Sequence, residues 1–442
     1  SSISNDVLRI ARSGPGDPCS ITHPDKISMT TDTLVLGAGI VGVSAALHLQ
    51  ERGQSVAIID RSAPGEGASF GNAGLLERSS VIPYAIPRDL RTLLNFATNR
   101  AAAVHYDPAF LPRIAPWLMG YWKASHPDRL RTIARELLPL IEACLDEHDR
   151  LVQAAGLSHL VRRDGWVEIV RSEAGLAEAG QRSHDLRRDF GLASDVLDRA
   201  ALSRLEPSRK AAAIGGIHWR DPFTVTDPSA LTKGYAAYFE SKGGTIYCET
   251  IRSLTRQANG WRVTTDRGQH EAANVVVALG AHSGALLAAQ GYNVPLVGKR
   301  GYHLHFRAEA GAMLNHAVLD EEVGYVLAPM AAGIRLTTGV ELAAPTAPVN
   351  RIQMDRAERR AHEIFPLGDP VEEKPWLGLR PATPDMKPVI GPAPNHRGLW
   401  FAFGHAHHGL TLGPATGRLL AEMMTGEKPF ADPTPFDIRR LM

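Results

Sequence analysis

The chain has 442 residues, of which 44% are hydrophobic and 21% charged, and its net charge is +1. This length exceeds the usual size of one hydrophobic core, so two domains are expected in a globular protein of ordinary composition. The balanced charge provides no basic face for nucleic acid, and no apolar run of about 18 residues could span a bilayer.

Residues 1–28 are polar, contain Gly and Pro, and lack the apolar segment of a secretion signal. We interpret them as a leader outside the fold, with a native arm that packs on a neighbour as the alternative. The cysteines Cys19, Cys144 and Cys248 form no CxxC pair, which disfavours a redox dithiol or a structural zinc site.

The first structured unit is a strand, a glycine turn, a helix, a second strand and an acid, in that order. Gly37 permits a tight turn, Gly39 lets a pyrophosphate approach the backbone, and Gly42 lets the helix pack on the strand. Asp60, eighteen residues after Gly42, is placed to accept hydrogen bonds from a ribose. This order predicts a dinucleotide site with contacts from Gly37, Gly39, Ile40, Val41, Gly42, Asp60 and Arg61.

Residues 61–76 (RSAPGEGASFGNAGLL) are rich in Gly, Ser and Ala. Such a stretch turns tightly and offers backbone N–H groups, so we expect it to wrap the cofactor rather than to form an ordinary surface loop. The expected contacts are Ser69, Asn72, Ala73, Gly74 and Leu75.

Residues 88–156 have the spacing of helices, with a Pro-interrupted aromatic patch from Phe110 to Trp122. Such a patch is usually core, and a lid over the active site or a contact with a membrane surface is the alternative. The chain is therefore expected to be cytoplasmic, with a possible peripheral contact at the inner face of the membrane.

The middle of the chain mixes strand and helix patterns. We expect a hairpin over Leu160–Val170 around Asp164-Gly165, helix over Glu173–Glu206 and from Pro228, and antiparallel strands over 296–342. A short helix is expected over 357–366. The buried strand that begins at residue 275 runs into a small-residue turn, where Ala278, Leu279 and Gly280 form a second approach to the dinucleotide.

The final segment predicts a strand over Leu399–Phe403, a loop to Gly413, and a helix whose first turn holds Pro414. Gly426 is a suitable residue to end that helix. We infer that backbone groups of Gly409, Leu410, Thr411 and Leu412 contact the far end of the cofactor.

Seven motifs occur in one order: GAGIVG, IIDR, GASFGNAGLL, TDPSALTKG, VVVALGAHSG, WLGLRPATPDMKPVIG and GHAHHGLTLGPATG. Together they resemble the FAD-dependent amino acid and amine oxidoreductases typified by glycine oxidase, sarcosine oxidase and D-amino acid oxidase. The resemblance is closest to bacterial D-amino acid dehydrogenases and covers Thr31 to Met442.

The resemblance implies an α/β (α+β overall) fold with two discontinuous parts. A Rossmann-like FAD-binding domain would comprise 29–87, 211–293 and 377–442. A substrate domain with a mixed or antiparallel sheet would comprise 88–210 and 294–376, including a helical insert over 88–156.

The resemblance also implies a carboxylate-binding arginine, which here is Arg380, and its guanidinium fork suits that role. A structural ion pair is the alternative. Tyr325 and Tyr302 are candidate substrate-site tyrosines, with core aromatics as the alternative. His407 and His408 are candidates to line the pocket, and no metal site is expected from the histidines.

The implied reaction is oxidation of the C–N bond of a small amino acid by hydride transfer to flavin N5. An imine forms and hydrolyses to a keto acid and ammonia. Phe70 stands where some relatives have a flavin-linking histidine, so non-covalent FAD is expected. Oxygen, a quinone or an electron-transfer partner would take the electrons, and the oligomeric state is open.

Three alternatives remain. The substrate could be a secondary amine such as a D-proline derivative, sarcosine or an opine, with the chain possibly part of a complex. The chain could be a nicotinamide-linked dehydrogenase. It could also be a non-catalytic flavin-binding subunit that transfers electrons.

Overall fold

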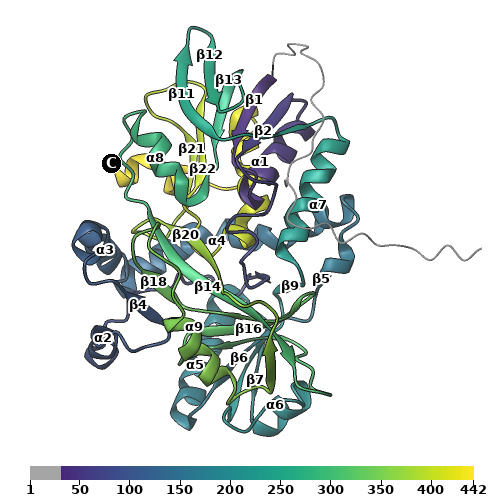
Figure 1. Ribbon diagram of the computed structural model, residues 1–442, viewed down its shortest axis with the longest axis vertical. Helices are drawn as coiled ribbons and strands as arrows, with labels where there is room; N and C mark the ends of the chain where they lie inside the picture. Colours follow the sequence, from purple (N-terminus) through teal and green to yellow (C-terminus); the bar gives the residue numbers. More distant parts are fainter. Residues whose placement is uncertain (1–30) are drawn as a thin grey trace, which may run out of the picture.

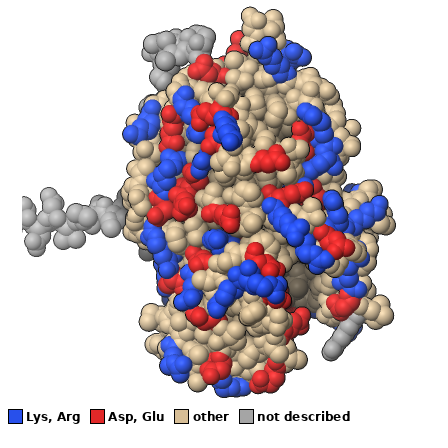
Figure 2. Space-filling view, turned by 180° about the vertical axis from the view of Figure 1, so that it is seen from behind, with Lys and Arg blue, Asp and Glu red and all other residues tan. Residues whose placement is uncertain are grey.

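A computed structural model describes residues 31–442, and the expected leader over 1–28 lies outside the described residues (Figure 1). Two large sheets organise the described chain, one at each end of the view. No helix of residues 31–442 is long and apolar enough to cross a membrane. On the face shown in Figure 2, basic and acidic side chains are interspersed, without a large patch of one sign.

The first sheet has eight strands in the order β10-β2-β1-β13-β12-β11, with β22 paired to β13 and β21 paired to β22. Its central pairs are parallel, and their residues are buried from both faces, which explains the continuous apolar runs in the sequence. The strands are β1 (Thr31–Leu36), β2 (Val56–Asp60), β10 (Thr245–Cys248), β11 (Ile251–Gln257), β12 (Gly260–Thr265), β13 (Gln269–Val277), β21 (Val389–Pro392) and β22 (Leu399–Phe403).

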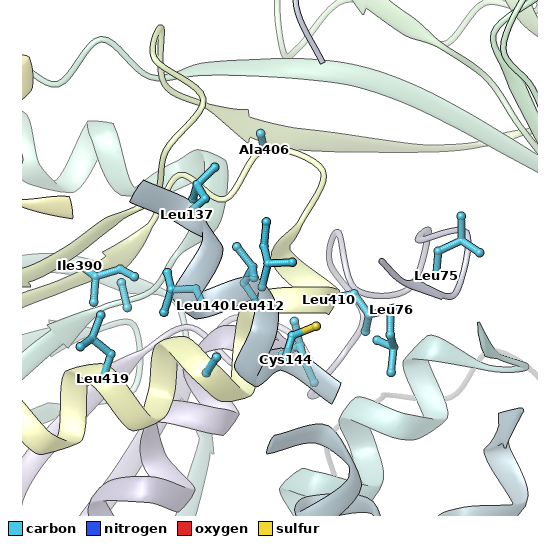
Figure 3. Packing of buried hydrophobic residues seen from close by; sticks show 14 of the residues in the cluster. Leu75, Leu76, Leu137, Leu140, Cys144, Ile390, Ala406, Leu410, Leu412 and Leu419 are labelled. Carbon is cyan, nitrogen blue, oxygen red and sulfur yellow. The ribbon is translucent and has the colours of Figure 1, made fainter. Parts of the chain in front are cut away.

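Helices α1 (Ile40–Glu51), α4 (Pro127–Ala154), α7 (Pro228–Ser241) and α10 (Gly409–Thr425) pack together beside this sheet. Helix α10 can approach α1 closely because a Cβ on Gly417 would lie 2.7 Å from the Ser44 backbone. Apolar side chains fill the space between α4 and α10, as Figure 3 shows for Leu137, Leu140, Leu412 and Leu419. This packing fixes where α10 begins.

The second sheet has eleven strands around the long strand β14, which pairs antiparallel with β17, β18, β19 and β20. Two pairs, β15 with β6 and β18 with β4, are parallel, so the expected mixed sheet is confirmed. The strands are β4 (Val104–Tyr106), β6 (Trp166–Val170), β7 (Ser194–Leu197), β8 (Gly215–Trp219), β14 (Val297–Ala308), β15 (Ala317–Asp320), β16 (Tyr325–Met330), β17 (Gly333–Thr337), β18 (Val340–Leu342), β19 (Leu367–Pro370) and β20 (Trp376–Ala382).

Smaller elements complete the described chain. Helices α5 (Glu173–Phe190), α6 (Arg199–Leu205) and α9 (Ile352–Ala361) pack on the second sheet. The expected helical insert contains α2 (Leu90–Ala97), α3 (Ala115–Ala124) and α4, and α8 (Ser283–Ala288) follows β13. A three-stranded sheet joins β3 (Leu75–Leu76), β9 (Phe223–Val225) and β5 (Val161–Arg162).

The prediction of a hairpin over Leu160–Val170 was wrong. The turn forms, with Gly165 at φ +75°, but β5 pairs with β9 while β6 pairs with β8 and β15. A turn signal specifies a local reversal of the chain and not the partner of each strand.

Two helix predictions also had wrong bounds. The helix expected over Glu173–Glu206 is broken by Gly191, which ends α5 in the left-handed conformation, and β7 follows before α6. The helix expected over 357–366 lies earlier, as α9.

Two strands of the second sheet fall wholly or mostly within segments expected in the FAD-binding domain. Strand β8, within residues 211–293, and strand β20, at residues 376–382, both belong to the second sheet. The division of the chain into domains at those boundaries therefore remains a prediction. By sheet membership, β8 and β20 would instead go with the expected substrate domain.

Candidate active site

A cavity of about 970 Å³ has walls from both large sheets. This volume is at the upper end of the range of about 300–1,000 Å³ for small-molecule sites. One part of the wall comes from residues that follow β2 and from β11 and α8, including Asp60, Ser253 and Ala285. Another part comes from β14, β20 and the loop before α10, and it includes Lys299, Arg380 and His407.

The three glycines of the first turn differ in their surroundings, and the close packing expected at Gly37 and Gly42 is present. Gly37 has φ +116°, and a Cβ there would lie 2.4 Å from the Ala278 carbonyl oxygen. A Cβ on Gly42 would lie 1.9 Å from the Gly37 oxygen, so only glycine lets α1 pack on this turn. Gly39 lines the cavity and has no atom closer than 3.6 Å to its Cβ position, which leaves space for a bound group.

Asp60 and Ser69 hold this turn in shape. The Asp60 carboxylate accepts hydrogen bonds from the N–H groups of Ala38 (2.8 Å) and Ser62 (3.0 Å). The Ser69 hydroxyl accepts one from the Ile40 N–H at 3.1 Å. A carboxylate has about four acceptor sites. Asp60 therefore keeps capacity for a ribose hydroxyl in the cavity.

The three expected approaches to the dinucleotide meet at one edge of the first sheet. Leu36 pairs with Val277 across β1 and β13, and Val277 pairs with Phe401 across β13 and β22. Because these strands are parallel, the residues after each of them emerge on the same side.

Helix α10 begins earlier than the sequence predicts. It starts at Gly409, so Pro414 lies inside the helix and not in its first turn. Pro414 has no N–H for the Leu410 carbonyl, and His148 Nε2 lies 2.8 Å from that oxygen instead. Burial lowers the pKa of His148 to about 4, so the neutral ring makes this contact by donating from Nε2.

Most of the predicted cofactor contacts line the cavity, and five do not. The lining residues among them are Gly39, Ile40, Val41, Asp60, Arg61, Ser69, Asn72, Ala73, Leu75, Ala278, Leu279, Gly280, Gly409 and Leu410. Gly37, Gly42, Gly74, Thr411 and Leu412 are not in the wall. The Thr411 hydroxyl instead accepts a hydrogen bond from the Glu77 N–H at 3.1 Å, which ties α10 to the chain after β3.

Arg380 lies in the cavity wall without an acidic partner among the described residues. Its Nη1 donates to the Gly339 carbonyl at 2.9 Å and its Nη2 to the Thr338 carbonyl at 3.1 Å. Its guanidinium lies over Gly301, where a Cβ would be 2.3 Å from Nη1. Burial lowers the pKa of Arg380 to about 10, so the group stays charged at neutral pH with donors left for a ligand.

Lys299 is a second buried cation in the same wall, 3% exposed. It pairs directly with Arg380 across β14 and β20, so both side chains are on one face of the sheet. Its Nζ lies 4.1 Å from the centre of the Tyr121 ring and 5.2 Å from that of Trp117, and no described carboxylate pairs with it. Burial, followed by the charge of Arg380, lowers the pKa of Lys299 to about 7.

His407 lies beside these cations, and His408 does not line the cavity. The His407 ring contacts the Tyr84 ring edge-on, with centroids 4.9 Å apart. Burial and the charges of Lys299 and Arg380 hold the pKa of His407 well below its usual value, so the ring is neutral. Among residues 31–442, no group of His, Cys, Asp and Glu could hold a metal ion.

The two candidate tyrosines are fully buried, and their hydroxyl groups are bound elsewhere. The Tyr302 hydroxyl bonds Arg300 at 2.9 Å and Glu341 at 2.5 Å. The Tyr325 hydroxyl bonds the Arg360 carbonyl and Arg171, each at 3.4 Å. Both residues contribute to the wall, but neither hydroxyl is free for a substrate.

Sequence reasoning missed Lys299, Tyr84 and Trp376, which all line the cavity. A signal for Lys299 was present, because alternation along β14 places residues 299, 301, 303 and 305 on one face and Arg300 and Tyr302 on the other. Trp376 carried no such signal: its ring lies where a Cβ on Gly71 would be, at 1.7 Å.

Comparisons with known proteins agree with this geometry. Residues 32–423 match the family described as "DAO: FAD dependent oxidoreductase". The chain belongs to this family.

Individual relatives match over most of their length. The chain is 30% identical to a D-amino-acid oxidase of Bradyrhizobium diazoefficiens, over 92% of this chain and 98% of that protein. It is 28% identical to a D-amino acid dehydrogenase of Chromohalobacter salexigens, over 92% and 99%. The structure of glycine oxidase from Geobacillus kaustophilus has the same fold, with a TM-score of 0.73 at 22% identity over 93% and 99% of the two chains.

The cavity of this DAO-family chain fits FAD. The N-termini of α1 and α10 both adjoin it, and neither helix has an acidic residue in its first turn. Such helix ends favour an anionic or electron-rich group. Gly39 leaves room for the pyrophosphate, and Asp60 for the ribose, so the chain is an FAD-dependent oxidoreductase with the residues to hold its cofactor.

Proposed function

We propose that this chain oxidises the C–N bond of a D-amino acid, whose carboxylate binds Arg380, with non-covalently held FAD. The observation that carries the proposal is a pair of cations, the half-buried Arg380 and the buried Lys299, that line the cavity without a described acidic partner. A buried charge without a partner is costly, so such a site is suited to an anionic ligand. The names of the two relatives support a D-amino acid as the substrate class.

Arg380 would fix the substrate by its carboxylate. Two of its N–H groups are held by backbone carbonyls of Thr338 and Gly339, so the guanidinium has one orientation. The remaining donors can bind a carboxylate, and this orients the α-carbon within the cavity.

His407 adds no positive charge to the proposed site. The pKa of His407 is held well below its usual value beside the cations, so the ring is neutral and does not compete with Arg380 as a cation for the substrate carboxylate. Bound FAD would supply the hydride acceptor for this oxidation, while residues of the chain hold and orient the substrate. The imine product hydrolyses to a keto acid and ammonia, and an external acceptor takes the electrons.

Non-covalent attachment of FAD is supported by the residues near the cofactor loops. By the family resemblance, Phe70 stands where some relatives have a linking histidine, and no described cysteine lines the cavity. Acid precipitation of the protein should therefore release all of the flavin into the supernatant.

The variant Arg380→Leu tests the proposed anchor. Loss of a charge-assisted hydrogen bond is worth about 1.5–3 kcal/mol, so KM for a D-amino acid should rise about 10- to 100-fold, while FAD stays bound. Arg380→Lys should recover part of this loss. The exposed Arg439→Leu serves as the matched control. Unchanged KM in Arg380→Leu would remove Arg380 from the substrate site.

A further inference from the structure

The wall formed by β14 and β20 holds two cations, one more than the single carboxylate of a simple amino acid can pair with. Arg380 accounts for the α-carboxylate in the proposed function, and Lys299 remains. No described carboxylate pairs with Lys299, and its Nζ has only the ring faces of Tyr121 and Trp117 as neighbours of opposite polarity. Cation–π contacts of this kind offset about 0.5–2 kcal/mol, less than the cost of burying an ion.

The two cations start side by side and point to different places. Lys299 and Arg380 face one another across β14 and β20. The Arg380 guanidinium extends over Gly301 toward the carbonyls of Thr338 and Gly339. The Lys299 ammonium extends toward the rings of helix α3. They therefore form two anion sites in one cavity and not a single shared one.

We propose that Lys299 binds a second carboxylate, on the side chain of the substrate, and that the chain prefers acidic D-amino acids such as D-glutamate or D-aspartate. This inference rests on the proposed function. A substrate with two carboxylates and a neutral amine brings two negative charges, one for Lys299 and one for Arg380. Such a ligand also raises the fraction of charged Lys299, whose pKa of about 7 leaves it partly neutral without a ligand.

The test compares isosteric substrates. Flavin reduction by D-glutamate and D-aspartate is measured without oxygen beside D-glutamine and D-asparagine, at pH 6.5, with wild-type holoenzyme. A charge-assisted contact predicts about a 10- to 100-fold higher kcat/KM for the acid over its amide. Lys299→Met should lower kcat/KM for the acids toward the value for their amides and so abolish that ratio, and Lys299→Arg should retain it. Lys123→Met, exposed on α3, is the control.

The outcomes separate the inference from the function on which it rests. Wild-type enzyme that oxidises neutral D-amino acids without preferring the acids would overturn the role of Lys299 alone. So would a Lys299→Met enzyme, with normal flavin content, that keeps the preference. If no amino acid reduces the flavin of the wild type, both the proposed function and this inference fail.

Discussion

At the scale of single residues, the site combines groups that burial should disfavour. Lys299 and Arg380 are cations in a buried wall, and burial lowers the pKa of each. Residues kept in such a costly state serve binding more often than stability. Sequence reasoning identified Arg380 from a motif. It missed Lys299, because alternation along β14 shows which face Lys299 is on but not that Arg380 of β20 lies beside it.

Lys299 should therefore reduce the stability of the protein without substrate. Its folded pKa, about 7, is below the unfolded value, so the unfolded chain binds more protons between about pH 7 and 10. The loss of stability caused by the buried charge of Lys299 is complete below about pH 7. It disappears as the pH rises toward the pKa of a lysine in the unfolded chain. Lys299→Met should raise the free energy of unfolding by about 1–4 kcal/mol at pH 6 and by less at pH 9.

Chemical denaturation of both proteins at the two pH values measures this difference. Lys123→Met, at an exposed position on α3, should change stability little at either pH. A Lys299→Met protein that is less stable at pH 6 than the wild type would mean that Lys299 contributes to the fold.

At the scale of elements, local sequence signals predicted that a helix or strand exists better than they predicted where it begins and ends or which strand it pairs with. The glycine turn, α1, α7 and the insert helices follow from spacing and caps. The prediction of a hairpin at Asp164-Gly165 was wrong because β5 and β6 pair with strands far away in the sequence, β9 and β8. The predicted start of α10 was wrong because proline usually lies in the first turn of a helix. Here Pro414 lies further inside, and His148, which comes from α4, donates to the Leu410 carbonyl that proline leaves without a partner.

His148 and Pro414 should therefore be coupled energetically. His148→Leu leaves the buried Leu410 carbonyl without a donor and should destabilise the protein by about 1–3 kcal/mol. Pro414→Ala restores a backbone donor to that carbonyl. His148→Leu should therefore lower the free energy of unfolding less in the Pro414→Ala protein than in the wild type, which keeps Pro414.

A thermodynamic cycle of the four proteins, from denaturant midpoints, measures the coupling. His148 Nδ1 also lies 3.1 Å from the Tyr235 hydroxyl, so Tyr235→Phe is the control for that second contact. Strictly additive effects of His148→Leu and Pro414→Ala would contradict this account of how α10 tolerates proline.

At the scale of the whole molecule, two sheets and their covering helices lie at opposite ends (Figure 1). The cavity of about 970 Å³ has walls from both sheets. The sequence predicted the three cofactor approaches, since each follows an apolar strand. It did not predict that β8 and β20 join the second sheet, because sheet membership depends on pairs far apart in sequence. The cation pair arises from that pairing: β20 brings Arg380 to Lys299 on β14.

The most direct test of the central claim is reduction of the bound flavin by amino acids in the absence of oxygen. The account predicts loss of the visible flavin absorption with a D-amino acid, release of the matching keto acid, and little reaction of Arg380→Leu at the same concentration. Purified protein that binds FAD but is reduced by no amino acid, or equally well with Arg380 replaced, would contradict it.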